Sequence, residues 1–491
     1  MISLAPDRWQ GYYRSSRLFL SIGKTEKSIL LYDAATRKAK QGSKEFEELS
    51  KLKELIDTAI LQRPAQPSLS VNELPTELLA DIFLLAASDS ETPQVFQFTI
   101  NTVSHVCRHW RSIAFGTSSL WRTLVLHSVR PVAKARFFVQ RSKNRLHGIH
   151  MRHSLHSIKE DIIPELRRVR WQHVQSFVME SSLKISKSTV EYIGSGVLQN
   201  VQEVSIVDPD NLLLANINLE PLLATLNPRL RTFTFELPRL HKLQKIMFSN
   251  IKTLNLKISE SEGRWDDLVE FVVRNSELED LRLNGNHAMS RFMPDSIDEK
   301  FTLQYVYRLH LERFSRSVPF FDNITFPALR ELTLIGCGSL LDKFARQITQ
   351  PICLTYLDVQ TCYVSANDMN ALLSGSADLE TLKLNHIGDA VQEIVERLSS
   401  SSTICPNLQY LDLSFCPDIT TSPLHRLVKD RLTTSQVEGT GQSETLPVKA
   451  LVSLRVDGCP KIEAELIPWF RSRLKEFSCG YMTRKAASYK R

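Results

Sequence analysis

Cys107 is the residue of this chain best placed to act as a nucleophile, since His105 and His109 stand two residues away on either side. A thiolate next to an imidazole base is the arrangement that activates a cysteine. The helix predicted around Cys107, however, places its side chain on an apolar stripe, where a small buried cysteine serves packing. We therefore expect no nucleophile here and no cofactor.

Four histidines follow one another at steps of three residues, as a zinc site could require: His147, His150, His153 and His156. Residues 147–151 have the pattern of a strand, and a three-residue step along a strand alternates between its two faces. The flanking Arg145 and Arg152 would repel a cation. A solvated basic edge is the favoured interpretation, and we expect no metal ion.

The 491 residues contain no Walker loop, no G-x-G-x-x-G turn after a strand, no G-x-S-x-G and no H-E-x-x-H, so we expect no enzyme. The apolar content of 42% is ordinary for a soluble protein, and a net charge of +7 is modest for this length. Eight cysteines without a C-x-x-C pair favour reduced thiols. Without a membrane span or a convincing signal segment, the cytoplasm and the nucleus are the expected compartments.

A basic cluster follows the first predicted strand: Arg130, Lys134, Arg136, Arg141, Lys143 and Arg145. It could contact an acidic surface. More often such residues form the solvated face of one helix, which is the favoured interpretation.

One stretch, residues 71–121, has the clearest pattern of short helices. Pro75 occupies a first helical turn, where its missing N–H has no partner in any case. One helical stripe is predicted from residues at i, i+4 and i+8: Leu74, Leu78 and Ile82. A second amphipathic helix is predicted from the spacing of Val103, Val106, Cys107, Trp110, Ile113 and Ala114. Such a segment is too small to bury all this apolar surface alone, so we expect a partner helix.

These residues resemble an F-box, whose pattern is Leu-Pro-x-Glu-Leu-Leu-x-x-Ile-Phe, then Val-Cys-Arg-x-Trp-Arg, then Leu-Trp. The matching positions are Leu74–Phe83, Val106–Arg111 and Leu120–Trp121. The long spacer between the helices is similar to the F-box-like variant common in fungi. The resemblance implies that the segment binds the Skp-type adaptor of a cullin–RING ubiquitin ligase. The residues implied in its core and adaptor-facing surface are Leu74, Pro75, Leu78, Ile82, Val106, Cys107, Trp110 and Trp121, and the sequence does not separate the two groups.

From Trp121 onward a strand pattern, apolar-x-x-apolar-x-apolar, recurs mostly at intervals of about 21 to 29 residues, the range of leucine-rich repeats. Its copies begin at Trp121, Val174, Val201, Leu230, Ile251, Leu278, Val306, Leu329, Leu354, Leu379, Leu408, Leu451 and Leu474, with a weaker copy at Leu146. A subset resembles the cysteine-containing repeat class, with Asn286, Cys337, Cys362, Cys416 and Cys459 at one fixed position. One unit cannot bury its own face, so the units are expected to stack. We predict an α/β fold, in which a helical F-box-like segment precedes a curved leucine-rich-repeat solenoid with a parallel concave sheet.

The remaining boundaries follow from composition and pattern. Residues 1–42 sustain no period and are predicted to be poorly ordered. The further predicted parts are an amphipathic helix at 43–62, a linker at 63–70, the F-box-like domain at 71–126, the solenoid at 121–480 with a mobile insert at about 433–444, and a basic tail at 481–491.

The strand residues that alternate with the inward leucines are expected to face the hollow of the solenoid. The acids predicted there are Glu203, Glu236, Asp280, Glu312, Glu331, Asp358, Asp412, Asp457 and Glu476, and the bases are Lys257, Arg282, Arg308, Lys383 and Arg455. A slightly acidic hollow disfavours a nucleic-acid groove and suits a protein partner. The predicted target-binding residues are Arg282, Tyr356, Asp358, Lys383, Tyr410, Asp412, Arg455 and Asp457, of which the two tyrosines are the aromatic anchors.

By resemblance, we expect the chain to be the substrate-recognition subunit of an SCF-type E3 ubiquitin ligase. It would bind the adaptor through the F-box and an unknown protein target through the repeats, with no nucleic acid and no membrane as partner. The alternative is a non-ligase interaction scaffold whose F-box-like part caps the solenoid.

Overall fold

The computed structural model describes residues 9–21, 24–39, 44–61, 71–88, 93–126, 130–151, 162–180, 192–193, 196–207, 226, 229–237, 248–258, 265–285, 300–314, 324–347, 353–400, 404–436 and 448–480. The chain forms two compact units, Met1–Asp81 and Ile82–Arg491. The boundary between them falls within helix α4 (Thr76–Ser88). None of the described helices is long and apolar enough to cross a membrane.

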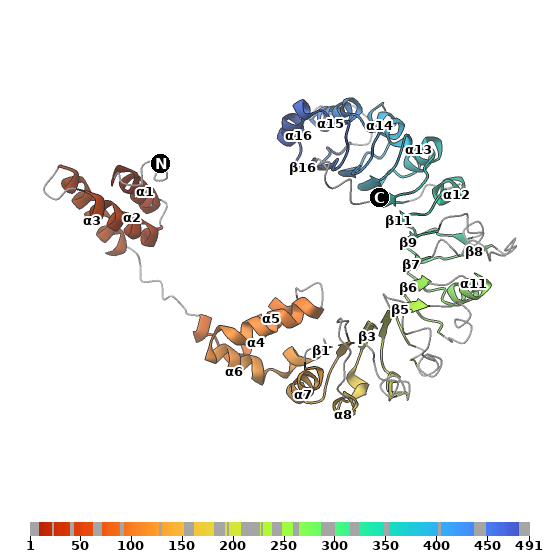
Figure 1. Cartoon of the computed structure of the whole chain (residues 1–491), viewed down its shortest axis with the longest axis horizontal. Helices are drawn as coiled ribbons and strands as arrows, with labels where there is room; N and C mark the ends of the chain where they lie inside the picture. The colour runs from red at the N-terminus through yellow and green to blue at the C-terminus, as the bar shows by residue number, and fades with distance from the viewer. Residues whose placement is uncertain are drawn as a thin grey trace. The chain divides into compact units, whose positions relative to one another are not determined.

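In its described part, the first unit begins with three helices, α1 (Trp9–Ser21), α2 (Thr25–Lys38) and α3 (Lys44–Leu61) (Figure 1). Two serines hold α1 against α2, because the hydroxyl of Ser16 donates to the carbonyl of Ser28, and that of Ser28 to the carbonyl of Ser16, both at 2.8 Å. The low order predicted for residues 1–42 therefore does not hold for Trp9–Ser21 and Thr25–Lys38. A search for apolar periods does not count buried serines such as Ser16 and Ser28, although Trp9 and Ala35 are buried in the same unit.

Helix α3 occupies the range predicted for an amphipathic helix, and its Leu49, Leu52 and Ile56 are buried. The predicted linker at 63–70 and the predicted basic tail at 481–491 lie outside the described residues. Of the predicted insert at 433–444, residues 433–436 are the last turn of helix α15 (Thr421–Gln436), and the remainder lies outside the described residues.

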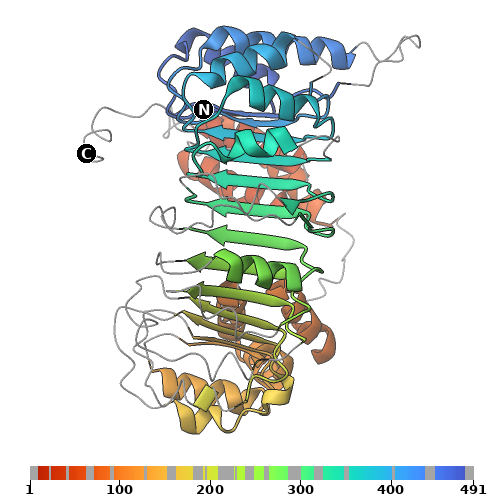
Figure 2. The same ribbon diagram turned by 90° about the vertical axis from the view of Figure 1, so that its right-hand side faces the viewer.

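The second unit contains a parallel sheet, and the predicted α/β leucine-rich-repeat solenoid is confirmed. Strand follows strand in chain order, and Figure 2 shows the strands lying one above another like rungs. In the described residues they are β1 (Thr123–Leu126), β2 (Gly148–Met151), β3 (Ser176–Glu180), β4 (Glu203–Val207), β5 (Thr232–Leu237), β6 (Thr253–Ile258), β7 (Asp280–Asn284), β9 (Arg308–Glu312), β11 (Glu331–Ile335), β12 (Tyr356–Gln360), β13 (Thr381–Asn385), β14 (Tyr410–Asp412), β15 (Ser453–Arg455) and β16 (Glu476–Ser478). A separate pair, β8 (Phe301–Thr302) and β10 (Ile324–Thr325), lies between repeats.

Helical returns cover the other side of the sheet (Figure 1). They are α7 (Pro131–Arg141), α8 (Ile163–Leu166), η4 (Trp171–His173), α11 (Trp265–Arg274), α12 (Leu340–Gln347), α13 (Ala366–Ser374), α14 (Ala390–Ser400), α15, η8 (Ala464–Leu466) and α16 (Ile467–Arg473). Between the two layers lies a core of inward strand residues, of which Leu254, Leu256 and Leu281 are typical with 0% exposure. The alternate strand residues are left for the concave face.

A ladder of cysteines links successive repeats at the ends of the strands. The thiols of Cys337, Cys416 and Cys459 donate to carbonyls of the preceding repeat, those of Leu311, Leu384 and Leu413, at 3.2, 2.9 and 3.1 Å. Cys362 makes the same contact with the Leu334 carbonyl at 3.6 Å, and Asn286 lies outside the described residues. Burial raises the pKa of Cys416 to about 12 and that of Cys459 to about 11. These thiols are therefore structural hydrogen-bond donors.

We predict that Cys416 and Cys459 of the folded protein resist iodoacetamide at about pH 8, whereas the exposed Cys353 reacts, because the thiolate is the nucleophile. Mass spectrometry of the labelled peptides measures this, and in urea all three should react alike. Since burial raises both pKa values above the ordinary 9.0, the stability that these thiols contribute is complete below that pH and is lost as the pH rises towards 12. Equal labelling of Cys416 and Cys353 in the folded protein would contradict the ladder.

Candidate functional site

Helix α4 begins directly after a corner at Leu74-Pro75. A short turn, η2 (Val71–Glu73), is closed by a hydrogen bond from the N–H of Leu74 to the carbonyl of Val71 at 3.3 Å. Pro75 comes next, and its carbonyl accepts the first helical bond from the N–H of Leu79 at 3.1 Å. A residue in this place needs no N–H donor, so proline fixes the start of the helix without the loss of a hydrogen bond.

Helix α4 is apolar on two faces, and only one of them is covered. The inner face is buried at i, i+4 and i+8, with exposures of 0%, 2% and 0% for Leu79, Phe83 and Ala87. The outer face, which we call the α4 stripe, has exposures of 50%, 43% and 71% for Leu78, Ile82 and Leu85. Neighbouring large apolar side chains left open on one helix mark a surface that a partner covers.

The second predicted helix is broken at Cys107 into α5 (Pro93–Val106) and α6 (Arg108–Gly116). Cys107 is extended, with φ −153° and ψ 173°, and its Sγ accepts the N–H of Trp110 at 3.4 Å. The prediction of one continuous stripe from Val103 to Ala114 is therefore wrong. Cys107 does not lie on an apolar helix face but caps α6, a role usually taken by serine, threonine, aspartate or asparagine.

Trp121 joins the F-box-like helices to the first repeat. Its indole is 1% exposed, and Nε1–H donates to the carbonyl of Ala114 in α6 at 2.7 Å. The rings of Phe115, Phe137 and Phe138 surround it, with centroid distances of 5.6, 5.1 and 5.3 Å. Since Phe137 and Phe138 belong to α7, one side chain packs on both sides of the junction. Trp121 is a core residue, and it leaves the set of residues that could face an adaptor.

The eight residues implied by the F-box resemblance thus divide by exposure. Pro75, Leu78, Ile82 and Val106 are exposed, Leu74, Cys107 and Trp110 are half-buried, and Trp121 is buried. The sequence patterns did not indicate two exposed apolar side chains, Leu85 of α4 and Phe98 of α5, each 71% exposed. Helical spacing could have indicated Leu85, which stands three residues after Ile82. No pattern marked Phe98, because the start of α5 was not predicted.

The concave face presents a mixed-charge hollow over its last strands. Lys383, Asp412 and Arg455 stand in register on β13, β14 and β15. A parallel row beside them consists of Tyr356, Thr381, Tyr410, Ser453 and Glu476. With Leu411, these residues line a hollow of about 350 Å³, which we call the C-terminal hollow.

Lys383 is held on one side of this hollow by Tyr356 and Asp358. Its Nζ lies 3.9 Å from Oδ2 of Asp358 and 5.1 Å from the ring centroid of Tyr356, whose hydroxyl donates to Asp358 at 3.0 Å. Partial burial acts to lower the pKa of Lys383, but Tyr356, Asp358 and Asp412 outweigh it, so the pKa is raised. Burial raises the pKa of Tyr356. At neutral pH the hollow offers an ammonium group beside a neutral phenol.

Several acids of the concave face are occupied by neighbouring strands. Asp280 pairs with Arg282 at 2.8 Å and with Arg308 at 3.1 Å, and Arg308 also pairs with Glu331 at 2.5 Å. The hydrogen bond with Glu331, together with Asp280, raises the pKa of Arg308 further above its ordinary range. These carboxylates therefore tie strands together, and the predicted acidity of the face overstates what a ligand would meet.

Five of the eight predicted target-binding residues line the C-terminal hollow: Tyr356, Lys383, Tyr410, Asp412 and Arg455. Arg282 instead lines a separate hollow of about 260 Å³ with Lys257 and His310. Asp358 is only 5% exposed, and Asp457 accepts bonds from the hydroxyl of Ser478 at 2.8 Å and the N–H of Gly480 at 2.5 Å. The hollow at the last strands is the place where the predicted residues come together.

The predicted histidine row does not form a metal site in the described part of the chain. His150 lies on β2 with 6% exposure, and His153 and His156 lie outside the described residues. Burial, together with Arg122 and His173, lowers the pKa of His147. No group of three or more histidine, cysteine or acidic side chains suited to a metal ion occurs among the described residues.

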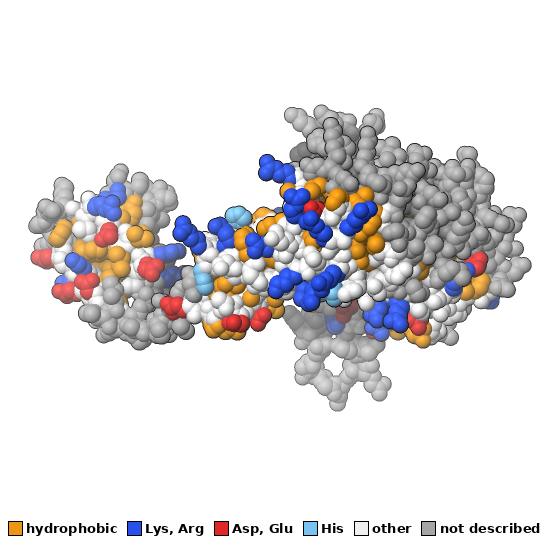
Figure 3. All heavy atoms as spheres, turned by 90° about the horizontal axis from the view of Figure 1, so that it is seen from below, with side chains coloured by type: hydrophobic (Ala, Val, Ile, Leu, Met, Phe, Trp, Pro, Cys, Tyr) orange, Lys and Arg blue, Asp and Glu red, His pale blue; other side chains and the backbone are white. Residues whose placement is uncertain are grey.

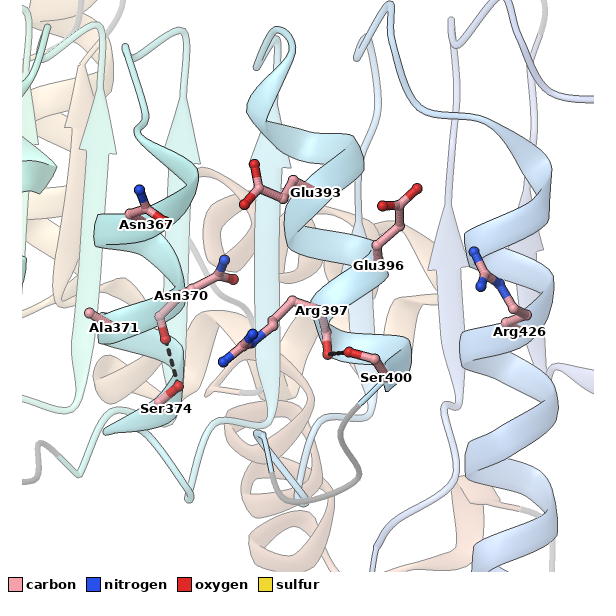
Figure 4. Close-up of a pocket in the computed structure, with 9 residues that line it drawn as sticks. All are labelled: Asn367, Asn370, Ala371, Ser374, Glu393, Glu396, Arg397, Ser400 and Arg426. Carbon is pink, nitrogen blue, oxygen red and sulfur yellow. Dashed lines mark hydrogen bonds between the residues drawn. The ribbon is translucent and has the colours of Figure 1, made fainter.

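The outer helices α13, α14 and α15 enclose a third hollow of about 630 Å³ (Figure 4). Its lining is polar apart from Ala371: Asn367, Asn370, Ser374, Glu393, Glu396, Arg397, Ser400 and Arg426. The hydroxyls of Ser374 and Ser400 donate to helix carbonyls at 2.7 and 3.1 Å, so neither is paired with a base. The lining supplies no nucleophile with a base beside it. We interpret this hollow as a solvated groove between helices.

Comparison with known proteins gives one family match and a likeness to solved structures. Residues 71–127 match the F-box-like family. No curated protein matches the chain. Among solved structures, the leucine-rich repeat-containing protein LegL7 of Legionella pneumophila aligns with 66% of this chain and 99% of its own, at 15% sequence identity and a TM-score of 0.33.

We predict that Trp121→Ala lowers the free energy of unfolding by about 3–5 kcal/mol, because it empties a site lined by three rings. Ile82→Ala should change it by less than about 0.5 kcal/mol, since that side chain lies on the uncovered face. Urea unfolding followed by circular dichroism measures both. If Ile82→Ala destabilises the protein as much as Trp121→Ala does, the α4 stripe is not an open surface.

Proposed function

We propose that this chain, an F-box-like segment joined to a leucine-rich-repeat solenoid, is the substrate-recognition subunit of an SCF-type, cullin–RING E3 ubiquitin ligase. In this proposal the F-box-like segment, of the variant common in fungi, binds a Skp-type adaptor, and the repeats bind a protein target in the cytoplasm or nucleus. The observation that carries it is the α4 stripe. It is an open row of Leu78, Ile82 and Leu85 on the first helix of a segment matching the F-box-like family.

The physical basis for adaptor binding is the separation of two apolar faces on α4. The inner face is used for folding, where the ring of Phe83 is tilted against that of Trp110 of α6 at a centroid distance of 4.9 Å. The outer face stays largely exposed, so this apolar area is available to a partner helix, at roughly 25 cal/mol per Å² of area removed from water. Exposed Val106 and Phe98 on α5 offer further apolar area.

The basis for target binding is the C-terminal hollow. Tyr410, which is 43% exposed, and Tyr356 supply rigid aromatic surface, and Lys383 and Arg455 supply positive charge. Aromatic and arginine side chains carry much of the energy in protein interfaces. We propose a target segment of mixed charge in contact with these residues.

In this function the chain itself performs no covalent step. Its contribution is proximity, because a bound target lysine is held near the charged ubiquitin-conjugating enzyme at a high effective concentration. No cofactor or metal ion takes part.

A second candidate function, a non-ligase scaffold, is favoured by the Trp121 junction. Trp121 packs between α6 and α7, as a cap on a solenoid would. Deleting residues 71–121 would expose that junction under either function, so repeat melting alone does not separate the two. Adaptor binding does, because a cap has no need of an open α4 stripe.

We predict that purified Skp-type adaptor binds the full chain and that Leu78→Asp/Ile82→Asp weakens the Kd by at least about thirtyfold, as the loss of about 2 kcal/mol at an interface hot spot requires. Biolayer interferometry measures the change. A control variant with two exposed aromatic side chains replaced on the solenoid, Tyr305→Asp/Tyr363→Asp, should bind normally. Absent binding by the unsubstituted chain, or an unchanged Kd in the α4 variant, would contradict the ligase function.

We predict that Tyr410→Ala/Lys383→Glu removes specific proteins from the set labelled by a proximity enzyme fused to the chain, while the adaptor stays labelled. The reason is that these two side chains line the C-terminal hollow, to which no residue of α4 contributes. The matched control is Tyr305→Ala/Lys300→Glu, an exposed aromatic and an exposed lysine outside the hollow. A labelled set that is the same for all three chains would remove the hollow as the target site.

A further inference from the structure

The positive charge of this protein is concentrated in one short part of the chain. Residues 122–180 hold twelve basic and four acidic residues, a net charge of +8, whereas the whole chain carries +7. The rest of the chain therefore has a net charge of −1. Such an asymmetry along a sequence is a sign of a polyanionic partner.

Those of the basic residues that the structure describes lie on the helices and turns of the first repeats, outside the concave face. Figure 3 shows Lys and Arg side chains spread over the face of α7 and α8. The N–H of Arg170 donates to the carbonyl of Asn144 at 2.9 Å, which brings the turn after α7 against the turn after α8. Lys143, Arg145 and Arg170 are all exposed there. We call this surface, made by residues 130–145 and 162–170, the basic face.

One buried acid orients two arginines on the basic face. Glu165, 4% exposed, accepts from Arg136 Nε at 2.8 Å and from Arg168 Nη1 at 3.0 Å, while those side chains stay 63% and 62% exposed. Two guanidinium groups against one carboxylate leave a net positive charge. Their remaining N–H groups are held in place for a second anion, and the planar guanidinium fits the oxygens of phosphate.

In its described residues, the basic face lacks the apolar anchors that a protein partner or a membrane would need. Among the described residues, no large exposed apolar side chain occurs between Val106 and Tyr305. Protein interfaces rely on buried aromatic or aliphatic anchors, and membrane surfaces are held by apolar side chains as well as by charge. The phosphate backbone of a nucleic acid needs only cations and hydrogen-bond donors.

We propose that the basic face binds the phosphate backbone of a nucleic acid, without base readout. The expectation that no nucleic acid binds was drawn from the acidic concave face, on which these residues do not lie. This binding is independent of the proposed ligase function. If both sites are occupied, a protein target in the C-terminal hollow is held close to the nucleic acid.

The test is fluorescence anisotropy of the full chain with a labelled DNA duplex of about 30 base pairs at several salt concentrations. We expect the affinity to fall steeply with salt. Lys143→Gln/Arg145→Gln/Arg170→Gln should weaken the Kd by about tenfold or more and lower the salt slope by about three, one for each lost phosphate contact. The matched control, Lys429→Gln/Arg471→Gln/Arg473→Gln, removes three exposed cations from α15 and α16 and should leave both quantities nearly unchanged.

Three outcomes would overturn the proposal. The first is equal weakening in the two triple variants, which would mean attraction without a site. The second is competition by poly-glutamate as strong as by unlabelled duplex at equal charge, which would point to an acidic protein segment. The third is preferential binding to vesicles rich in phosphatidylserine. Circular dichroism melting of both variants, expected to match the unsubstituted chain, shows that folding is not the cause.

Discussion

No repeat of this chain can bury its own apolar face, and the second unit is built around that constraint. Inward strand residues such as Leu254 and Leu281 reach 0% exposure only because a repeat lies on either side of them. The ends of the stack lack a neighbour and need another cover.

At the first repeat, Trp121 and Phe115 pack on Phe137. At the last, Phe470 of α16 stacks on Phe477 of β16 at 5.2 Å. Capping the stack is thus part of what the F-box-like helices do, through Phe115 of α6, and the α4 stripe stays exposed for another molecule.

The same constraint decides which polar residues are available for recognition. Because the inward positions are fixed by packing, only the alternate strand positions can vary without loss of the core. Many of these positions nevertheless hold neighbouring strands together, as Arg308 does between Asp280 and Glu331. Ion pairs of this kind contribute little stability at an open surface, but charges that are paired in this way are not available to bind a ligand. A ligand can therefore bind best where aromatic and cationic side chains face the hollow, and the last strands supply such side chains.

The repeat architecture was predictable because its signal is local and redundant. Apolar residues alternate within each strand, and this pattern returns at a nearly constant interval. Together these two periods indicate where the strands lie, in which order they stack and which cysteines fall at the ladder position. Two of the misses have a different origin, since each depends on an interaction that the spacing of apolar residues does not record. Ser16 and Ser28 join two helices through hydroxyls, and the Sγ of Cys107 ends one helix and starts the next. The candidate site was half predictable for the same reason. Strand alternation placed Lys383 and Arg455 in one row, but the occupation of Asp457 by Ser478 depends on a neighbouring repeat.

Composition averaged over the chain conceals the chemistry of its surfaces. A net charge of +7 on 491 residues excludes little, yet it arises almost entirely from the first repeats. The α4 stripe is apolar, the C-terminal hollow has mixed charge, and the basic face has one sign of charge. Apolar burial is nearly independent of ionic strength, whereas contacts with a polyanion weaken steeply as salt rises. The α4 stripe and the basic face therefore respond to different variables, and a partner held at one need not compete with a partner held at the other. Under the proposed function, which relies on proximity, this independence would allow one chain to bind several molecules at once.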